Sequence, residues 1–155
     1  MNDSLTPTLS ITRVLDAPRS IVWKAWTDPA HVSQWWGPHG CTVVADEADR
    51  RPGGSFRREM RSQSGAVVVV TGTFEEVIPE QRLVTNGVLE RPGCPPLKTR
   101  MTVTFEDRGG KTELTIVQTE ADFKEDFVAN AKLGWAQAFE KLEAHLATEK
   151  NRASQ

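Results

Sequence analysis

The sequence predicts an α+β fold in which a sheet of about seven antiparallel strands packs against a long C-terminal helix. Two observations support this prediction. Residues 8–16 and several segments within 40–121 alternate apolar and polar side chains, as strands do. Residues 124–147 instead repeat apolar side chains at helical spacing. A sheet with one apolar face needs such a cover, so residues 1–155 are expected to form one domain with an ordered core at about 8–147.

The chain begins with a strand and two short helices. In residues 8–16, one alternating set of side chains shares a face: Leu9, Ile11, Arg13 and Leu15. Asp16 then offers a carboxylate to the free amides of a helix start, and Pro18 suits the first helical turn. Asp28 and Pro29 repeat this start signal. The first strand is therefore followed by two short helices.

Two adjacent tryptophans, Trp35 and Trp36, fall in the last turn of the second helix, before Gly37 ends it. Successive helical side chains point about 100° apart, so the two rings cannot pack in one direction. Two interpretations stay open: the rings fill an ordinary core, or they line the wall of a cavity. A polar-lined cavity supplies a partner for a buried indole N–H more readily than a dry core does. Trp135 on the terminal helix has the same two interpretations.

Strands separated by turn signals such as Pro52-Gly53-Gly54 are predicted through residues 40–121. We expect the terminal helix to pack on the sheet face that carries Val103, Phe105, Leu114 and Ile116. The apolar stripe of that helix consists of Phe127, Ala131, Gly134, Trp135, Ala138, Phe139, Leu142 and Leu146. Glycine inside a helix costs about 1 kcal/mol relative to alanine. Gly134 therefore indicates close approach of a strand or of a ligand.

Three charged side chains fall among apolar neighbours on predicted strands: Arg13, Arg58 and Glu76. Arg58, for example, shares its face with Phe56 and Met60. An unpaired buried charge costs on the order of several kcal/mol, so each needs a partner, water or a place near a strand end. Ion pairs or rim positions meet this need. The alternative is that Arg58 or Arg13 binds an anionic group of a ligand, because a guanidinium matches carboxylate geometry.

Charge and motifs limit the possible functions. The net charge is −2, from 19 basic and 21 acidic residues without long like-charge runs, so nucleic acid is not an expected partner. The chain has no secretory pattern and no run of about 18 apolar residues, which favours a cytoplasmic protein without a membrane partner. His31, His39 and His145 belong to no catalytic or metal-binding motif and are interpreted as structural or solvated. No cofactor, metal site or catalytic residue is predicted.

The two cysteines, Cys41 and Cys94, lie outside any metal-binding spacing. Their neighbours in the sequence are apolar or proline-rich and include no basic activator. Both thiols are therefore expected to be unpaired and slow to react.

The predicted order of strand, two helices, six strands and long helix is the helix-grip arrangement. Several stretches carry a resemblance to a known family: DAPRSIVWKAWTDPAHVSQWWGP, RPGGSFRREM, GTFEEVIPEQRLV, VTFEDRGGKTELTI and GWAQAFEKLEAHL. Over roughly residues 8–147 the chain resembles the activator of heat-shock-protein-ninety ATPase homologue family, within the START-like (SRPBCC) superfamily. The resemblance implies a curved sheet that grips the terminal helix around an apolar pocket, a scaffold used to bind lipids, hormones and polyketides. One fold hosts many functions, so the resemblance alone assigns no chemistry.

Three classes of function stay open on this basis. The first is binding of a small, largely apolar or aromatic molecule in a cavity between the sheet and the C-terminal helix. The second is an enzyme that acts on such a molecule, cyclase- or dehydratase-like, with Glu or His as general base. The third is a co-chaperone-like interaction protein, as the family name suggests.

The expected wall of the cavity combines apolar side chains with a few polar groups that orient the ligand. It consists of Trp35, Trp36, Phe56, Arg58, Met60, Phe74, Glu76, Met101, Gln118 and Trp135. A homodimer is also expected, because the run from Val67 to Val70 puts apolar side chains on both faces of one strand.

Overall fold

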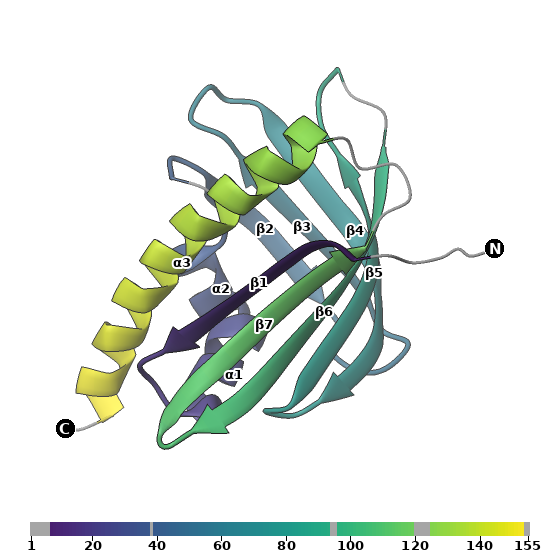
Figure 1. The fold of residues 1–155 in the computed structure, drawn as a ribbon. Helices are drawn as coiled ribbons and strands as arrows, with labels where there is room; N and C mark the ends of the chain where they lie inside the picture. Colours follow the sequence, from purple (N-terminus) through teal and green to yellow (C-terminus); the bar gives the residue numbers. More distant parts are fainter. Residues whose placement is uncertain (1–6, 38, 94–95, 120–124, 154–155) are drawn as a thin grey trace.

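A computed structural model describes residues 7–37, 39–93, 96–119 and 125–153 (Figure 1). The elements follow one another in the predicted order. The strands are β1 (Pro7–Leu15), β2 (Thr42–Ala48), β3 (Ser55–Arg61), β4 (Val67–Ile78), β5 (Arg82–Glu90), β6 (Leu97–Arg108) and β7 (Lys111–Thr119). The helices are α1 (Arg19–Thr27), α2 (Pro29–Trp35) and α3 (Glu125–Ala153).

The seven strands form one antiparallel sheet in the order β1-β7-β6-β5-β4-β3-β2. Each strand from β2 to β7 pairs with its neighbour in the chain, whereas β1 pairs with β7. Figure 1 shows the sheet bent, with α3 lying diagonally across its hollow side. The short helices α1 and α2 contact each other and α3, and α1 also contacts β6 and β7. The predicted α+β helix-grip class is therefore confirmed.

The strand register places the predicted apolar set on the concave face. Val103 pairs with Ile116, and Phe105 pairs with Leu114. All four side chains are buried in one core cluster with four residues of α3: Ala138, Phe139, Leu142 and Leu146. The terminal helix thus packs on the expected face, and this part of the sheet is closed to solvent.

The starts of the two short helices differ in how they are capped. Helix α1 has no side-chain cap, because Asp16 lies outside it and places its carboxylate 3.2 Å from Lys150 of α3. The predicted capping role of Asp16 is therefore wrong. Asp28 does cap α2, since its carboxylate accepts a hydrogen bond from the backbone N–H of Ala30 at 3.0 Å. An N-cap of this kind contributes typically ~1 kcal/mol.

Three expectations about helix interiors and ends differ from the structure. Helix α2 ends at Trp35, and Trp36 already has an extended backbone with φ −65° and ψ 139°. The chain leaves the helix between the two residues, and their rings still contact each other with centroids 5.3 Å apart. A Cβ atom on Gly134 would meet no described atom within 4 Å, so the expected close approach of a strand is wrong, while approach of a ligand stays a prediction. Helix α3 also extends to Ala153, past the predicted end. The side chain of Phe127 lies outside the described residues.

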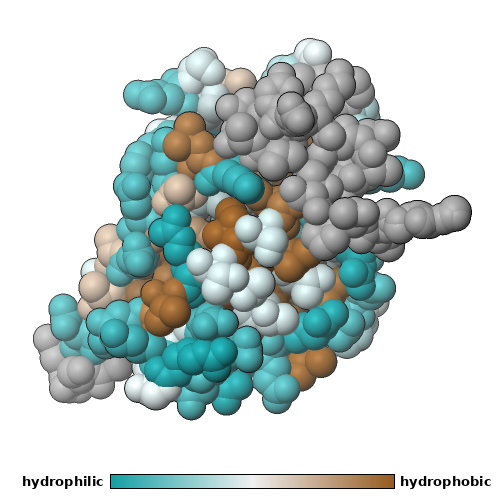
Figure 2. All heavy atoms as spheres, viewed as in Figure 1, coloured by the Kyte–Doolittle hydropathy of each residue, from teal (hydrophilic) through white to brown (hydrophobic). Residues whose placement is uncertain are grey.

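The outer face of the sheet over β1 and β7 is weakly polar. Figure 2 shows apolar and weakly polar side chains gathered at the centre of this view, with hydrophilic ones around them. Val14 on β1 is 53% exposed, and the hydroxyls of Thr12 and Thr115 lie 3.2 Å apart across the two strands.

Val67 and Val70 of β4, on which the expected homodimer rests, are half-buried. The homodimer stays a prediction. Within the described residues, no helix combines the length and the apolar character needed to span a bilayer.

Candidate functional site

Four tryptophans pack together where the three helices meet the concave face, and we call them the tryptophan cluster: Trp26, Trp35, Trp36 and Trp135. The ring centroid of Trp26 lies 4.8 Å from that of Trp35, 5.7 Å from that of Trp36 and 6.0 Å from that of Trp135. Trp35 is fully buried and donates its indole N–H to the backbone oxygen of Ala25 at 2.9 Å. These contacts favour the core interpretation for Trp35. Trp26, at the centre of the cluster, was not among the residues predicted from the sequence.

The other two predicted tryptophans are half-buried and have polar neighbours from the predicted wall. The indole N–H of Trp135 donates to the side-chain oxygen of Gln118 at 3.2 Å. The guanidinium carbon of Arg58 lies 4.3 Å from the ring centroid of Trp36, which is a cation–π distance. The structure thus brings Trp36, Trp135, Arg58 and Gln118 to the same edge of the tryptophan cluster.

Beyond the edge of the tryptophan cluster, the concave face of the sheet is less covered by other parts of the chain than it is beneath α3. Several of its apolar side chains are half-buried: Phe56, Val70, Leu89, Leu97 and Met101. The register sets them in rows across the strands. One row of paired residues consists of Arg58, Val70, Leu89 and Leu97. The next consists of Phe56, Gly72, Gly87 and Thr99. We call these two rows the open half of the concave face.

The two glycines at the middle of the open half allow close backbone packing. A Cβ atom on Gly72 would lie 2.0 Å from the backbone oxygen of Asn86, closer than any side chain permits. A Cβ atom on Gly87 would lie 3.5 Å from the ring of Phe56. That ring packs against Phe74 with a centroid distance of 5.3 Å. The two glycines therefore contribute no side chains at the middle of the open half, and the ring of Phe56 lies over Gly87.

A buried group of three charges lies at the edge of the open half. Arg58 on β3 pairs in register with Asp46 on β2, and its Nη2 lies 3.4 Å from the Asp46 Oδ2. Arg50 donates to the same oxygen at 3.2 Å. The side chains of Arg58 and Asp46 are only 12% and 5% exposed. Burial lowers the pKa of Arg58, while the Asp46 carboxylate raises it. One carboxylate thus serves two guanidiniums, which leaves an excess positive charge in a largely buried place.

Several buried polar atoms of the concave side have no hydrogen-bond partner among the described residues. They are Asp46 Oδ1, Arg58 Nε, Thr99 Oγ1 and Trp26 Nε1. Buried polar atoms in folded proteins are nearly always paired with protein groups or ordered water. These atoms therefore leave hydrogen-bonding capacity inside the fold that a polar group of a ligand or water can use.

Glu76 and Arg13, the other two charged residues singled out in the sequence, lie outside the open half of the concave face. A β-bulge between Phe74 and Glu76 shifts the register of β4, so Val77 packs on the core instead of Glu76. Glu76 pairs with Arg82 at 3.2 Å, and both side chains are more than a third exposed. Alternation along the strand gave no sign of this bulge, and the expected inner-face position of Glu76 is wrong. Arg13 is exposed, with its guanidinium carbon 5.4 Å from the centroid of the Phe139 ring.

The remaining predicted wall residues keep their expected face. Met60 and Phe74 are buried, and Met101 pairs with Gln118 across β6 and β7. Two hollows at the surface of α3, of about 380 and 580 Å³, are lined by none of the predicted wall residues. The cavity between sheet and helix therefore stays a prediction.

Cys41 follows the turn after α2, and the structure adds a basic neighbour that is not apparent from the sequence. Burial raises the pKa of the Cys41 thiol, and the nearby Lys141 lowers it by a smaller amount. Cys41 is a free thiol, whereas Cys94 lies outside the described residues.

We expect Cys41 to react with iodoacetamide at neutral pH more slowly than an exposed cysteine does. A raised pKa means a smaller thiolate fraction, so the labelling rate should keep rising with pH beyond the usual thiol range. Mass spectrometry of the labelled Cys41 peptide against time measures this rate. The Lys141→Gln variant should react more slowly still, and faster labelling of that variant would contradict the explanation.

Comparison with known proteins identifies a family. The model of the family described as Activator of Hsp90 ATPase homolog 1-like protein matches residues 16–147. A solved structure of a protein from Chromobacterium violaceum is similar, with a TM-score of 0.79 and 27% identity over 89% of this chain and 95% of that one. No curated protein matches the chain.

Two further solved structures support the fold alone. An AHSA1 protein from Silicibacter pomeroyi has a TM-score of 0.77 and 23% identity over 91% of this chain and 98% of that one. A protein from the dynemicin biosynthetic locus has a TM-score of 0.70 and 24% identity, and it covers 91% of this chain and 47% of that one.

Proposed function

Because this chain belongs to the Activator of Hsp90 ATPase homolog 1-like protein family, we propose that it binds a small, largely apolar molecule carrying an anionic group. The molecule lies in the open half of the concave face, beside the tryptophan cluster. The observation that carries the proposal is the buried Arg58. It shares Asp46 with Arg50, and its Nε has no partner among the described residues. An excess buried positive charge is stabilised by an anion that takes up its remaining donor.

The neighbouring side chains fit the apolar body of such a molecule. The half-buried row beside Arg58 is aliphatic, and the ring of Phe56 lies over the adjacent glycine row. Trp36 and Trp135 add aromatic surface at the edge, with centroids 5.4 Å apart. Ligand sites usually combine apolar walls with a few polar groups that fix orientation. An aromatic carboxylic acid meets both requirements.

Tryptophan emission of the purified chain tests this proposal. A panel of aromatic carboxylic acids should quench or shift the emission in a saturable way, and each acid should bind at least about tenfold more tightly than its neutral amide. A hydrogen bond to a charged group contributes about 1.5–3 kcal/mol, which exceeds the ~1.4 kcal/mol of a tenfold difference. The Arg58→Met variant should lose the preference for the acid. Trp135→Phe should weaken the response more than it lowers stability.

Arg82→Met is the matched control, because Arg82 is an arginine of the same sheet that pairs with Glu76 and is 38% exposed. It should bind the acids as the unmodified chain does. Equal affinity for acids and amides, or an acid preference that survives in Arg58→Met, would overturn the role of Arg58. If no compound in a broad panel alters the emission, the proposed binding function is wrong.

A further inference from the structure

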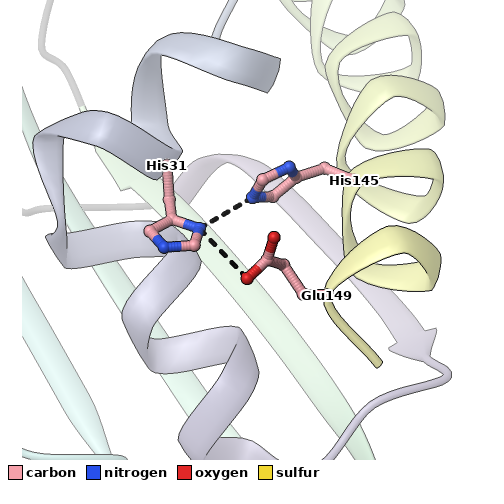
Figure 3. A group of neighbouring side chains, drawn as sticks. All are labelled: His31, His145 and Glu149. Atoms are coloured by element: carbon pink, nitrogen blue, oxygen red, sulfur yellow. Dashed lines mark hydrogen bonds and ion pairs between the residues drawn. The ribbon is translucent and has the colours of Figure 1, made fainter. Parts of the chain in front are cut away.

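A second group of polar side chains lies between α2 and α3, away from the open half of the concave face. Figure 3 shows His31 of α2 turned toward His145 and Glu149 of α3. The Nδ1 of His31 lies 2.8 Å from the Nε2 of His145 and 3.9 Å from the Oε1 of Glu149. His145 and Glu149 are four residues apart, so they share one face of the helix. We propose that these three side chains bind a divalent transition metal ion of the zinc class.

The distances suit such an ion. One ligand atom from each side chain lies within 4.8 Å of the others. In a tetrahedral zinc site with bonds of about 2.0–2.1 Å, neighbouring ligand atoms are about 3.3–3.4 Å apart. The observed distances of 2.8 and 3.9 Å lie on either side of this value. Binding of the ion therefore requires side-chain rotations that break the direct contact between the imidazoles.

The contacts around the three side chains orient them toward one another. The Nδ1 of His31 and the Nε2 of His145 share one hydrogen bond, so one of these nitrogens carries a proton that it must give up before both can bind the ion. Arg152 lies 3.3 Å from the Oε2 of Glu149, so the other carboxylate oxygen is left to face the histidines. Partners of this kind orient metal ligands in known sites.

The three side chains line the surface hollow of about 580 Å³ between α2 and α3, together with Gln34, Lys141 and Thr148. The hollow gives an ion access from solvent and leaves room for water as a fourth ligand. Lys141 and Arg152 are cationic, so attraction by charge alone is weak here. Two imidazole nitrogens instead favour zinc, nickel or copper over magnesium and calcium, which prefer oxygen ligands.

Isothermal titration of the tag-free, EDTA-treated chain with Zn²⁺ tests the site directly. One ion per chain should bind, and Zn²⁺ should raise Tm while Mg²⁺ does not. His31→Ala and His145→Ala should each weaken binding by at least about tenfold, as even the loss of an outer partner does. His39→Ala is the matched control, because His39 lies 3.2 Å from Glu140 in an exposed pair without a second histidine. This variant should bind as the unmodified chain does.

Glu149→Gln keeps the shape of the side chain and tests the site if a histidine variant unfolds. Relative to its own Tm in EDTA, this variant should lose most of the Tm increase that Zn²⁺ causes in the unmodified chain. Co²⁺ bound at the site should show the visible absorption of tetrahedral coordination, and His31→Ala should remove it. Absence of Zn²⁺ binding, or binding that persists in the His31→Ala/His145→Ala double variant, would overturn the proposal. None of these residues belongs to the proposed ligand cavity, so this outcome is independent of the emission experiment.

Discussion

Replacing Trp35 with alanine is expected to lower the free energy of unfolding by about 3–5 kcal/mol, the usual range for a buried aromatic residue. Trp35 is fully buried, and its ring packs against Trp26 and Trp36 at centroid distances of 4.8 and 5.3 Å. The change also removes the hydrogen bond to the backbone oxygen of Ala25. Since folded domains are stable by only about 5–15 kcal/mol, this variant should unfold at much lower urea concentrations.

The adjacent residue provides the control for this prediction. Trp36→Ala removes a half-buried ring that lies under the Arg58 guanidinium, so it should cost less stability and affect ligand binding more. Urea unfolding followed by circular dichroism compares the two variants without relying on tryptophan emission. If Trp35→Ala destabilises the chain no more than Trp36→Ala does, Trp35 does not fill a close-packed core.

Replacing Asp46 with alanine should lower the free energy of unfolding by about 3–5 kcal/mol, because it leaves buried cations without their carboxylate. Both Arg58 and Arg50 donate to Asp46 Oδ2, at 3.4 and 3.2 Å. Arg58→Met should cost less, since Arg50 still compensates the Asp46 charge. Methionine also fills much of the space of the arginine stem.

The double variant Asp46→Ala/Arg58→Met separates the charge interaction from other effects. If the loss in Asp46→Ala comes from the unpaired Arg58, the double variant should be more stable than Asp46→Ala alone. Urea unfolding of all four proteins gives the coupling free energy between the two sites. Strict additivity of the two single changes would show that Asp46 and Arg58 do not interact, contrary to this prediction.

Much of the fold follows from local patterns in the sequence. Alternation placed Val103 and Ile116 on the concave face, and helical spacing placed Phe139 against them, as the structure confirms. These patterns are reliable because one buried face fixes the register of every strand. The bulge next to Glu76 was not predictable in this way, since it depends on how β4 pairs with β5.

The candidate sites were harder to predict because their members are distant in the sequence. Arg58 was singled out as a charge on an apolar face, but its partner Asp46 became visible only through the pairing of β2 with β3. His31 and His145 are 114 residues apart, and no motif joins them. The spacing of His145 and Glu149 was the one local sign of that group.

The pairing of β1 with β7 also has a consequence for how the chain folds. The Thr12 and Thr115 hydroxyls that meet across these strands are 103 residues apart in the sequence. During synthesis, β1 leaves the ribosome first, yet the strand that it pairs with is made only after β6. The hairpins from β2 to β6 need only local contacts, and loop closure over so many residues is slow. We therefore expect the sheet to be completed at β1 late in folding, and until then the apolar side chains of Leu9 and Leu15 have no β7 beside them.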